Sequence, residues 1–187
     1  MARNVEIKAR IASVEALEPH AAALADQGPF DIAQDDIFFR CAQGRLKLRA
    51  FSDTEGELIF YRRADQAGPK ASFYLRTPTA DPAGLREALT LAWGQAGRVR
   101  KQRRLFLAGR TRIHLDRVEG LGDFVELEVV LADGEAVQAG VQEATLLMAE
   151  LGIDPSQLIE QAYVDLLGGD GPQAAATSTR RRHRRWQ

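Results

Sequence analysis

The sequence predicts an α+β domain built on eight mostly antiparallel β-strands, which would close into a barrel or form a strongly curved sheet. Eight segments alternate apolar and polar residues with the period of two that is typical of strands. Only a few residues separate the third segment from the fourth and the sixth from the seventh, which favours antiparallel hairpins. The eight expected strands cover residues 3–11, 35–40, 44–51, 57–63, 71–77, 98–107, 110–117 and 123–131.

Four helical patterns accompany these strands, over residues 13–26, 81–94, 134–151 and 154–167. The second begins with Asp81, an N-cap residue, and has Pro82 at the first helical position, where proline is favoured. The fourth repeats this start at Asp154 and Pro155, and Gln157 stands where it would complete a capping box. We therefore expect continuous helices at these two places, whereas a proline interrupts the weaker first pattern.

The composition is that of a folded protein without a membrane span. Of the 187 residues, 45% are hydrophobic and 27% are charged, which excludes disorder for most of the chain. No apolar run approaches the roughly 18 residues that a transmembrane helix needs, and the N-terminal residues contain no apolar signal-peptide core. The single cysteine, Cys41, excludes an internal disulfide and a cysteine-based metal site. These features together predict a cytoplasmic protein that does not bind membranes.

Charge is divided unevenly along the chain. The formal net charge is −1, but residues 168–187 carry +4 and residues 1–167 carry −5. The last segment is rich in small residues and then in arginine, which is typical of a flexible tail. We therefore expect a folded domain over residues 1–167 and a flexible tail over 168–187, and only that tail has the charge for binding nucleic acid.

Charged side chains repeatedly share one face of an expected strand, opposite an apolar face. Five strands have this habit, and their polar sets are Glu6, Lys8 and Arg10; Arg45, Lys47 and Arg49; Lys101 and Arg103; Arg112, His114 and Asp116; and Glu126 and Glu128. Any one of these faces alone is explained by an amphipathic sheet with a solvated side. The same pattern on five strands favours a charged surface that binds a ligand.

Such a surface needs partners, because like charges opposite one another in a sheet are destabilising. Gathered cations require a polyanion, and a cluster of the carboxylates of Glu6, Asp116, Glu126 and Glu128 requires a divalent cation. Arg and Lys suit phosphate, and Mg²⁺ or Mn²⁺ prefers carboxylate and phosphate oxygens. The pattern therefore predicts a site for a metal-chelated polyphosphate.

Six motifs also carry a resemblance to a known family. They are Asn4–Lys8 (NVEIK), Gly44–Arg49 (GRLKLR), Leu58–Arg62 (LIFYR), Lys101–Phe106 (KQRRLF), Arg112–Asp116 (RIHLD) and Phe124–Glu128 (FVELE). In order and spacing, over about residues 3–167, they resemble the CYTH family, also called triphosphate tunnel metalloenzymes. The chain is most similar to bacterial class IV adenylate cyclases of that family. The resemblance implies an eight-stranded antiparallel barrel that forms a tunnel, with charged side chains inside and helices packed outside.

The resemblance also implies roles for individual residues. Mg²⁺ or Mn²⁺ would be held by Glu6, Asp116, Glu126 and Glu128. The triphosphate would be bound by Lys8, Lys47, Arg49, Arg62, Lys101, Arg103 and Arg112. The catalytic set would be Glu6, Lys8, Arg112, Asp116, Glu126 and Glu128.

Three functions are compatible with these residues. The overall likeness favours an adenylate cyclase that converts ATP to cAMP and pyrophosphate. A triphosphatase that hydrolyses inorganic tripolyphosphate, thiamine triphosphate or nucleoside triphosphates would use the same site. Asn4 stands where the family signature has its first glutamate, so a non-catalytic module that binds triphosphate or polyphosphate is the third possibility. The protein would work as a monomer or a homodimer.

Overall fold

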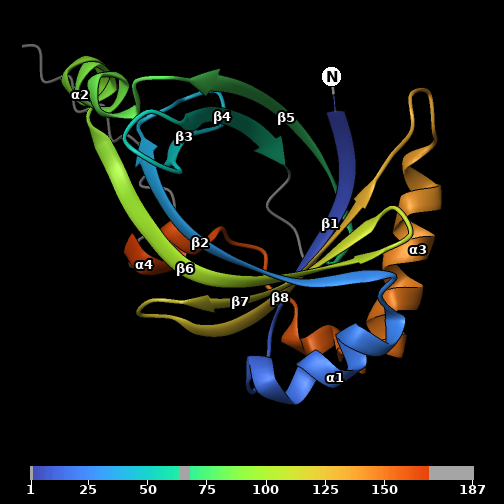
Figure 1. Cartoon of the computed structure of the whole chain (residues 1–187). Helices are drawn as coiled ribbons and strands as arrows, with labels where there is room; N and C mark the ends of the chain where they lie inside the picture. Colours follow the sequence, from blue (N-terminus) through green and yellow to red (C-terminus); the bar gives the residue numbers. More distant parts are fainter. Residues whose placement is uncertain (1, 64–67, 169–187) are drawn as a thin grey trace, which may run out of the picture.

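Eight antiparallel strands close into a barrel in the computed structural model, which describes residues 2–63 and 68–168 (Figure 1). Neighbouring strands follow the order β1-β5-β4-β3-β2-β6-β7-β8 around the barrel. The bounds are β1 Ala2–Arg10, β2 Gln27–Phe39, β3 Arg45–Ala50, β4 Gly56–Arg63, β5 Lys70–Thr79, β6 Gln95–Ala108, β7 Thr111–Val118 and β8 Gly122–Val130. The prediction of an antiparallel eight-stranded sheet is confirmed, and of the two expected forms the barrel is the one that occurs.

Strands β2 and β6 are longer than the sequence predicts. Strand β2 begins at residue 27 instead of 35, and β6 covers 95–108 instead of 98–107. The two strands pair with each other from Gln27↔Leu107 to Phe39↔Gln95. Because the partner strand supplies the hydrogen bonds, residues 27–34 extend without a clear alternation of their own.

Helices cover the apolar outer side of one half of the barrel. Helix α1 (Val14–Leu24) packs on β7, β6 and β8, and α3 (Val137–Glu150) packs on β1 and β8 (Figure 1). The main hydrophobic core lies between them and the strands, with Ile7, Ile113 and Leu127 almost completely buried. Apolar strand faces therefore point outward to the helices, which leaves the charged faces inside the barrel, as the resemblance implies.

Another helix, α2 (Pro82–Trp93), starts at the predicted place. The side chain of Asp81 accepts a hydrogen bond from the backbone N–H of Gly84, and Pro82 opens the helix. The helix packs on β3 and β2, where Leu89 joins Phe39 and Leu48 in a small separate core.

The continuous helix expected over 154–167 does not form. The capping box of Asp154 and Gln157 is present, but it closes only the 3-10 turn η1 (Pro155–Gln157). The chain then extends along β1, because Leu158 pairs with Ala9 and the N–H of Ile159 donates to the carbonyl of Lys8. Helix α4 begins only afterwards, over Tyr163–Gly168. Backbone pairing with β1 outweighs the local helical pattern here.

The segment after this turn fills one end of the barrel interior. Tyr163 and Val164 pack with inward-facing apolar residues from four strands in a second core cluster. These inward residues are Phe38 of β2, Val99 of β6, Val118 of β7 and Phe124 of β8. The interior of the barrel is therefore apolar at this end and charged beyond it.

No helix among the described residues is long and apolar enough to cross a membrane. The expected tail begins at the end of α4 and otherwise lies outside the residues that the structure describes.

The packing of α3 predicts that two substitutions by alanine on this helix differ sharply in their effect on stability. Met148 faces the main core and is 7% exposed, whereas Leu146 is 66% exposed. We expect Met148→Ala to lower the free energy of unfolding by about 2–5 kcal/mol, because it empties a core position. Leu146→Ala should change it by no more than about 0.5 kcal/mol. Urea unfolding followed by circular dichroism measures both, and equal effects would contradict the assigned helix face.

Candidate active site inside the barrel

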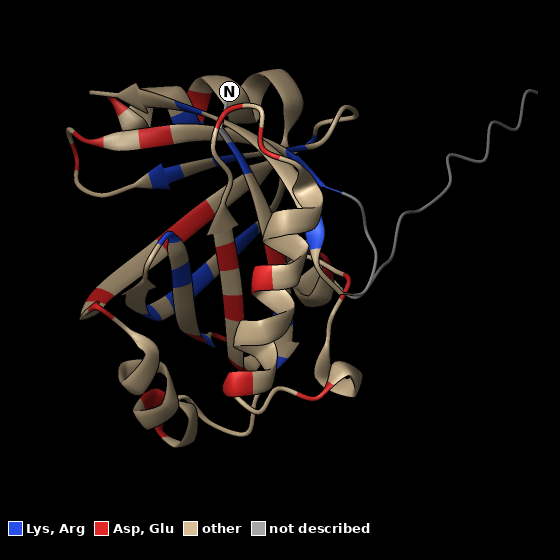
Figure 2. Ribbon diagram, turned by 90° about the vertical axis from the view of Figure 1, so that its right-hand side faces the viewer, with Lys and Arg blue, Asp and Glu red and all other residues tan. Residues whose placement is uncertain are grey.

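The barrel encloses a cavity of about 330 Å³ whose wall includes inward-facing side chains from all eight strands. Alternation along each strand selects them, as with Asn4, Glu6 and Lys8 of β1. Figure 2 shows how often charged positions recur along the strands of the barrel. The predicted charged interior is thus present.

Cations outnumber carboxylates on this wall. Its basic residues are Lys8, Lys47, Arg49, Arg63, Arg76, Lys101, Arg103 and Arg112, and its acidic residues are Glu6, Asp36, Glu126 and Glu128. These sets leave an excess of four positive charges, or three when the carboxylate of Asp116, buried behind the wall, is included. A cavity with this balance is suited to a polyanion.

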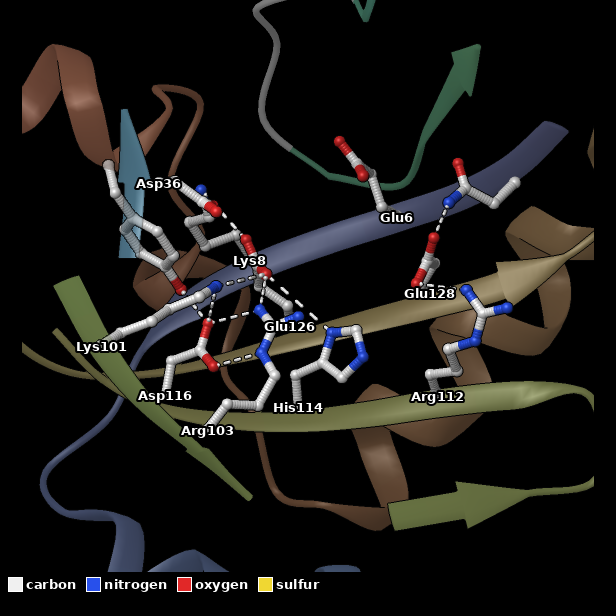
Figure 3. Close-up of polar contacts among 12 residues, drawn as sticks. Glu6, Lys8, Asp36, Lys101, Arg103, Arg112, His114, Asp116, Glu126 and Glu128 are labelled. Atoms are coloured by element: carbon white, nitrogen blue, oxygen red, sulfur yellow. Dashed lines mark hydrogen bonds and ion pairs between the residues drawn. The ribbon is translucent and has the colours of Figure 1, made fainter. Parts of the chain in front are cut away.

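Glu126 is the centre of the first group of charges (Figure 3). Its carboxylate lies 2.6 Å from Nη2 of Arg103 and 3.2 Å from Nζ of Lys8, and Lys101 is 3.9 Å away. Burial alone would raise the pKa of Glu126, but these cations hold it well below its usual value. Glu126 therefore stays ionised, and the protein itself supplies its counter-charges.

Asp116 lies behind this group, fully buried and outside the cavity wall. It accepts hydrogen bonds from Nζ of Lys101 at 2.8 Å, from Nε and Nη2 of Arg103 at 2.6 Å each, and from the hydroxyl of Tyr163 at 3.1 Å. Although burial acts to raise its pKa, Arg103 and Lys101 keep it low, so Asp116 is ionised. The structure does not bring Asp116 to the wall with the other predicted metal ligands.

Glu6 and Glu128 form a second group, apart from the cluster around Glu126 (Figure 3). They are direct cross-strand partners on β1 and β8. Arg63 donates to Glu6 at 2.8 Å, and Arg112 donates to Glu128 at 3.0 Å. The side-chain amide of Asn4 also donates to Glu128, while its own Oδ1 is buried without a hydrogen-bond partner. Backbone pairing thus sets two acidic residues opposite each other, and Asn4 on the same strand as Glu6 has an unpartnered oxygen.

Comparison with known proteins places the chain in a family. The model of the CYTH domain matches residues 2–163. The chain belongs to the CYTH domain family.

Three proteins similar to this CYTH domain are between 16% and 25% identical to it. Adenylate cyclase CyaB of Aeromonas hydrophila is 25% identical over 171 residues, which cover 86% of each chain. The PH1012 protein of Pyrococcus horikoshii OT3 has the same fold with a TM-score of 0.78 at 22% identity, over 87% of this chain and 98% of that one. HpAC1 from Hippeastrum gives a TM-score of 0.57 at 16% identity, over 92% and 98%. The two structures support the fold alone.

The donor set of the CYTH domain fits a metal that shares its coordination with a substrate. Within residues 2–63 and 68–168, no three acidic, histidine or cysteine side chains converge to hold an ion on their own. Glu6 and Glu128, which are cross-strand partners, and Asn4, which bonds Glu128, nevertheless supply hard oxygen donors from neighbouring positions. Mg²⁺ is typically held by one or two carboxylates together with substrate phosphates, and this set provides that many. Metal roles for Glu126 and Asp116 stay predictions.

Asp36 and Arg63 belong to the site although they are absent from the predicted set. Asp36 of β2 faces the cavity and bonds Lys47 and Arg49 of β3, whereas Arg63 of β4 bonds Glu6. The alternation of side chains along β2 could have indicated Asp36, because it places Asp36 on the same inward face as Gln34 and Phe38.

Arg62 does not face the cavity, so its predicted position is wrong. Its exposed side chain stacks over the outward-facing rings of Phe60 and Phe73. Register explains the difference: Tyr61 pairs with Arg45 and Tyr74, so Tyr61 and Arg63 point inward and Arg62 points out. The other predicted phosphate-binding residues, Lys8, Lys47, Arg49, Lys101, Arg103 and Arg112, all line the cavity.

His114 lies in the wall between the two groups and is neutral. Its Nδ1 is 4.0 Å from Glu126, and burial, aided by the nearby charge of Arg103, lowers its pKa well below the usual value. A neutral imidazole keeps one nitrogen free to accept a hydrogen bond.

The opposite placement of two adjacent arginines yields a direct test. We expect Arg63→Ala to weaken the binding of inorganic tripolyphosphate roughly 10–100-fold, because a charged hydrogen-bond donor is worth about 1.5–3 kcal/mol. Arg62→Ala removes the same charge from the outer surface and should change the dissociation constant less than about twofold. Isothermal titration calorimetry measures both. A larger effect at Arg62 would contradict the inward direction of Arg63.

The buried lysines make binding depend on pH. Burial lowers the pKa values of Lys8 and Lys47 to about 8 despite the attraction of Glu126 and Asp36. Both are charged below this value and lose the charge as the pH rises through it. We therefore expect the affinity for tripolyphosphate to fall as the pH rises above about 8, with proton uptake on binding. Calorimetry in buffers of different ionisation enthalpy measures both, and affinity independent of pH would disagree with this assignment.

Proposed function

We propose that this protein is a divalent-metal-dependent enzyme that converts ATP to cAMP and pyrophosphate inside the barrel. The observation that carries the proposal is the excess of cations on the cavity wall, around the paired carboxylates of Glu6 and Glu128. A polyphosphate would neutralise the cations, and Glu6 and Glu128 would hold a divalent ion whose charge would offset the repulsion between them. The sequence similarity to adenylate cyclase CyaB of Aeromonas hydrophila favours ATP as the substrate.

Binding and orientation would be the main tasks of the protein. Lys8, Lys47, Arg49, Arg63, Lys101, Arg103 and Arg112 would hold the triphosphate. Most of them are already fixed by ion pairs with Glu126, Asp116, Asp36, Glu6 and Glu128. Fixed cations stabilise charge that develops in the transition state without having to reorganise.

Metal binding would fall to Glu6 and Glu128, with Asn4 as a neutral neighbour, and Glu126 and Asp116 would act mainly on Lys8, Lys101 and Arg103. Dependence on a divalent ion is general among triphosphate tunnel enzymes of the CYTH family. When bound, Mg²⁺ or Mn²⁺ acts as a Lewis acid on the phosphate oxygens.

In the cyclase reaction, the 3′-hydroxyl of the ribose attacks the α-phosphorus, the bond from this phosphorus to the bridging oxygen breaks, and pyrophosphate leaves, while the hydroxyl proton is released to water or to the pyrophosphate. The cations of the wall would stabilise the negative charge on the leaving pyrophosphate. Neutral His114 would accept a hydrogen bond from the attacking hydroxyl.

Hydrolysis of a triphosphate is the alternative, because water can attack the terminal phosphorus in the same cavity. HpAC1 from Hippeastrum, which shares the fold, is described as having a dominant triphosphatase activity. Tripolyphosphate, thiamine triphosphate and nucleoside triphosphates all present the phosphate chain that the cations would hold.

Product analysis tests the reaction. Purified protein is incubated with ATP, and separately with tripolyphosphate, each with Mg²⁺ and with Mn²⁺, and the products are separated by ion-exchange chromatography. We expect cAMP and pyrophosphate in equal amounts from ATP, because no water enters the cyclisation. Orthophosphate without cAMP would assign the chain to the triphosphatases. Tight binding without any product would indicate a binding module.

Removing one carboxylate tests the metal site. We expect Glu128→Gln to abolish metal-dependent turnover and to weaken Mn²⁺ binding in the presence of tripolyphosphate roughly 10–100-fold, as with loss of a supporting metal contact. Electron paramagnetic resonance of free Mn²⁺ measures this without turnover. Glu119→Gln, in the exposed turn between β7 and β8, removes the same charge and should leave both properties unchanged. Unaltered Mn²⁺ binding in Glu128→Gln would refute the assignment.

A further inference from the structure

Two Lys-x-Arg pairs in the barrel each donate three hydrogen bonds to one aspartate of a neighbouring strand. In the first, Asp36 of β2 accepts from Nζ of Lys47 at 2.7 Å and from Nε and Nη2 of Arg49 at 2.6 and 2.7 Å. In the second, Asp116 of β7 accepts from Lys101 at 2.8 Å and from Arg103 at 2.6 Å twice. We name them the Asp36 clamp and the Asp116 clamp.

The two clamps differ in what else they bind. Asp116 also accepts a hydrogen bond from the hydroxyl of Tyr163, and Arg103 donates a further hydrogen bond to Glu126. Asp36 has only its own Lys47 and Arg49 as hydrogen-bond partners among the residues that the structure describes. The Asp116 clamp is therefore fixed into the wall on several sides, whereas the Asp36 clamp is held by a single carboxylate.

Free donors remain in the Asp36 clamp. A lysine has three N–H donors and an arginine five, and Asp36 takes one from Lys47 and two from Arg49. The remaining donors belong to side chains that line the cavity. Asp36 thus binds part of each cation and leaves the rest available to an anion.

The charge of Asp36 also affects the protonation of Lys47. Lys47 faces Asp36 of β2, Arg49 of β3 and Lys101 of β6, with the rings of Phe38 and Tyr61 also close by. Burial and the two cations lower the pKa of Lys47, and Asp36 is the carboxylate that opposes them. Burial also acts to raise the pKa of Asp36, but Lys47 and Arg49 keep it far below its usual range, so the Asp36 carboxylate is ionised at neutral pH.

We propose that Asp36 is a positioning residue, which holds Lys47 and Arg49 side by side as a preformed anion clamp. The inference rests on the proposed function, since the anion is the phosphate chain of the substrate. Asp36 would act through the two cations, without touching the substrate.

Asp36→Asn tests this role, because it keeps the shape and removes the charge. Its matched control is Asp35→Asn: the adjacent Asp35 is 38% exposed and pairs outside the barrel with Arg98 and Arg100. Both variants are made in the full chain. Tripolyphosphate binding is measured by calorimetry in EDTA between about pH 6.5 and about pH 9, and kcat and KM are measured with whichever triphosphate the wild type turns over.

We expect Asp36→Asn to bind tripolyphosphate at pH 6.5 as tightly as the wild type or more tightly, because the wall loses a negative charge. Its kcat should fall roughly tenfold or more, because the clamp loses its geometry. The alkaline loss of affinity should move down by roughly one pH unit, because Lys47 loses its carboxylate. Asp35→Asn should match the wild type in all three. A variant Asp36→Asn with unchanged kcat and pH profile would overturn the proposal.

A double variant keeps the test decisive if Asp36→Asn does not fold. Asp36→Asn combined with Lys47→Met removes one charge of each sign, and Lys47→Met alone is its reference. By the proposal, kcat is lower in the double variant than in Lys47→Met, because Arg49 has lost Asp36. The pH at which tripolyphosphate affinity is lost should be the same in both. A shift of that pH without Lys47 would overturn the role. Failure of the wild type to bind tripolyphosphate would count instead against the proposed function.

Discussion

Pairing of charges inside a closed barrel is the constraint on which the rest of this structure depends. Asp116 is fully buried and Glu126 is mostly buried, and each is compensated by two cations within hydrogen-bond distance. Unpaired charges at these depths would cost several kcal/mol each. Since the charged faces must meet one another inside, the apolar faces of the same strands point outward, and α1 and α3 are needed to cover them.

The barrel and most of its charged lining could be predicted from the sequence, because both follow from alternation within single strands. The error at Arg62 has a different origin. Alternation gives two faces for β4, but only pairing with Arg45 and Tyr74 decides that the face of Tyr61 and Arg63 is the inner one. Asp36 was missed for a similar reason, since its role depends on Lys47 and Arg49 of another strand.

The C-terminal segment shows how tertiary contacts can overrule a correct local signal. Asp154 and Gln157 form the predicted capping box, yet the helix stops after one turn because β1 offers backbone partners to residues 158 and 159. This extension brings Tyr163 into one end of the barrel interior, where Nζ of Lys8 lies 3.8 Å from the centre of its ring and its hydroxyl donates to Asp116. A continuous helix over 154–167 would leave Leu158 and Ile159 without these partners on β1.

Asn4 explains how the barrel can carry the paired carboxylates of Glu6 and Glu128 before any ligand arrives. A glutamate at position 4, as in the family signature, would add a third negative charge beside this pair and create a standing need for a cation. The amide of Asn4 instead donates a hydrogen bond to Glu128 and presents a neutral oxygen to the same region. Arg63 and Arg112 then suffice to balance the two carboxylates. If Glu6 and Glu128 hold the metal as proposed, Asn4 would lessen the demand for metal in the free protein, so that metal and polyphosphate would bind best together.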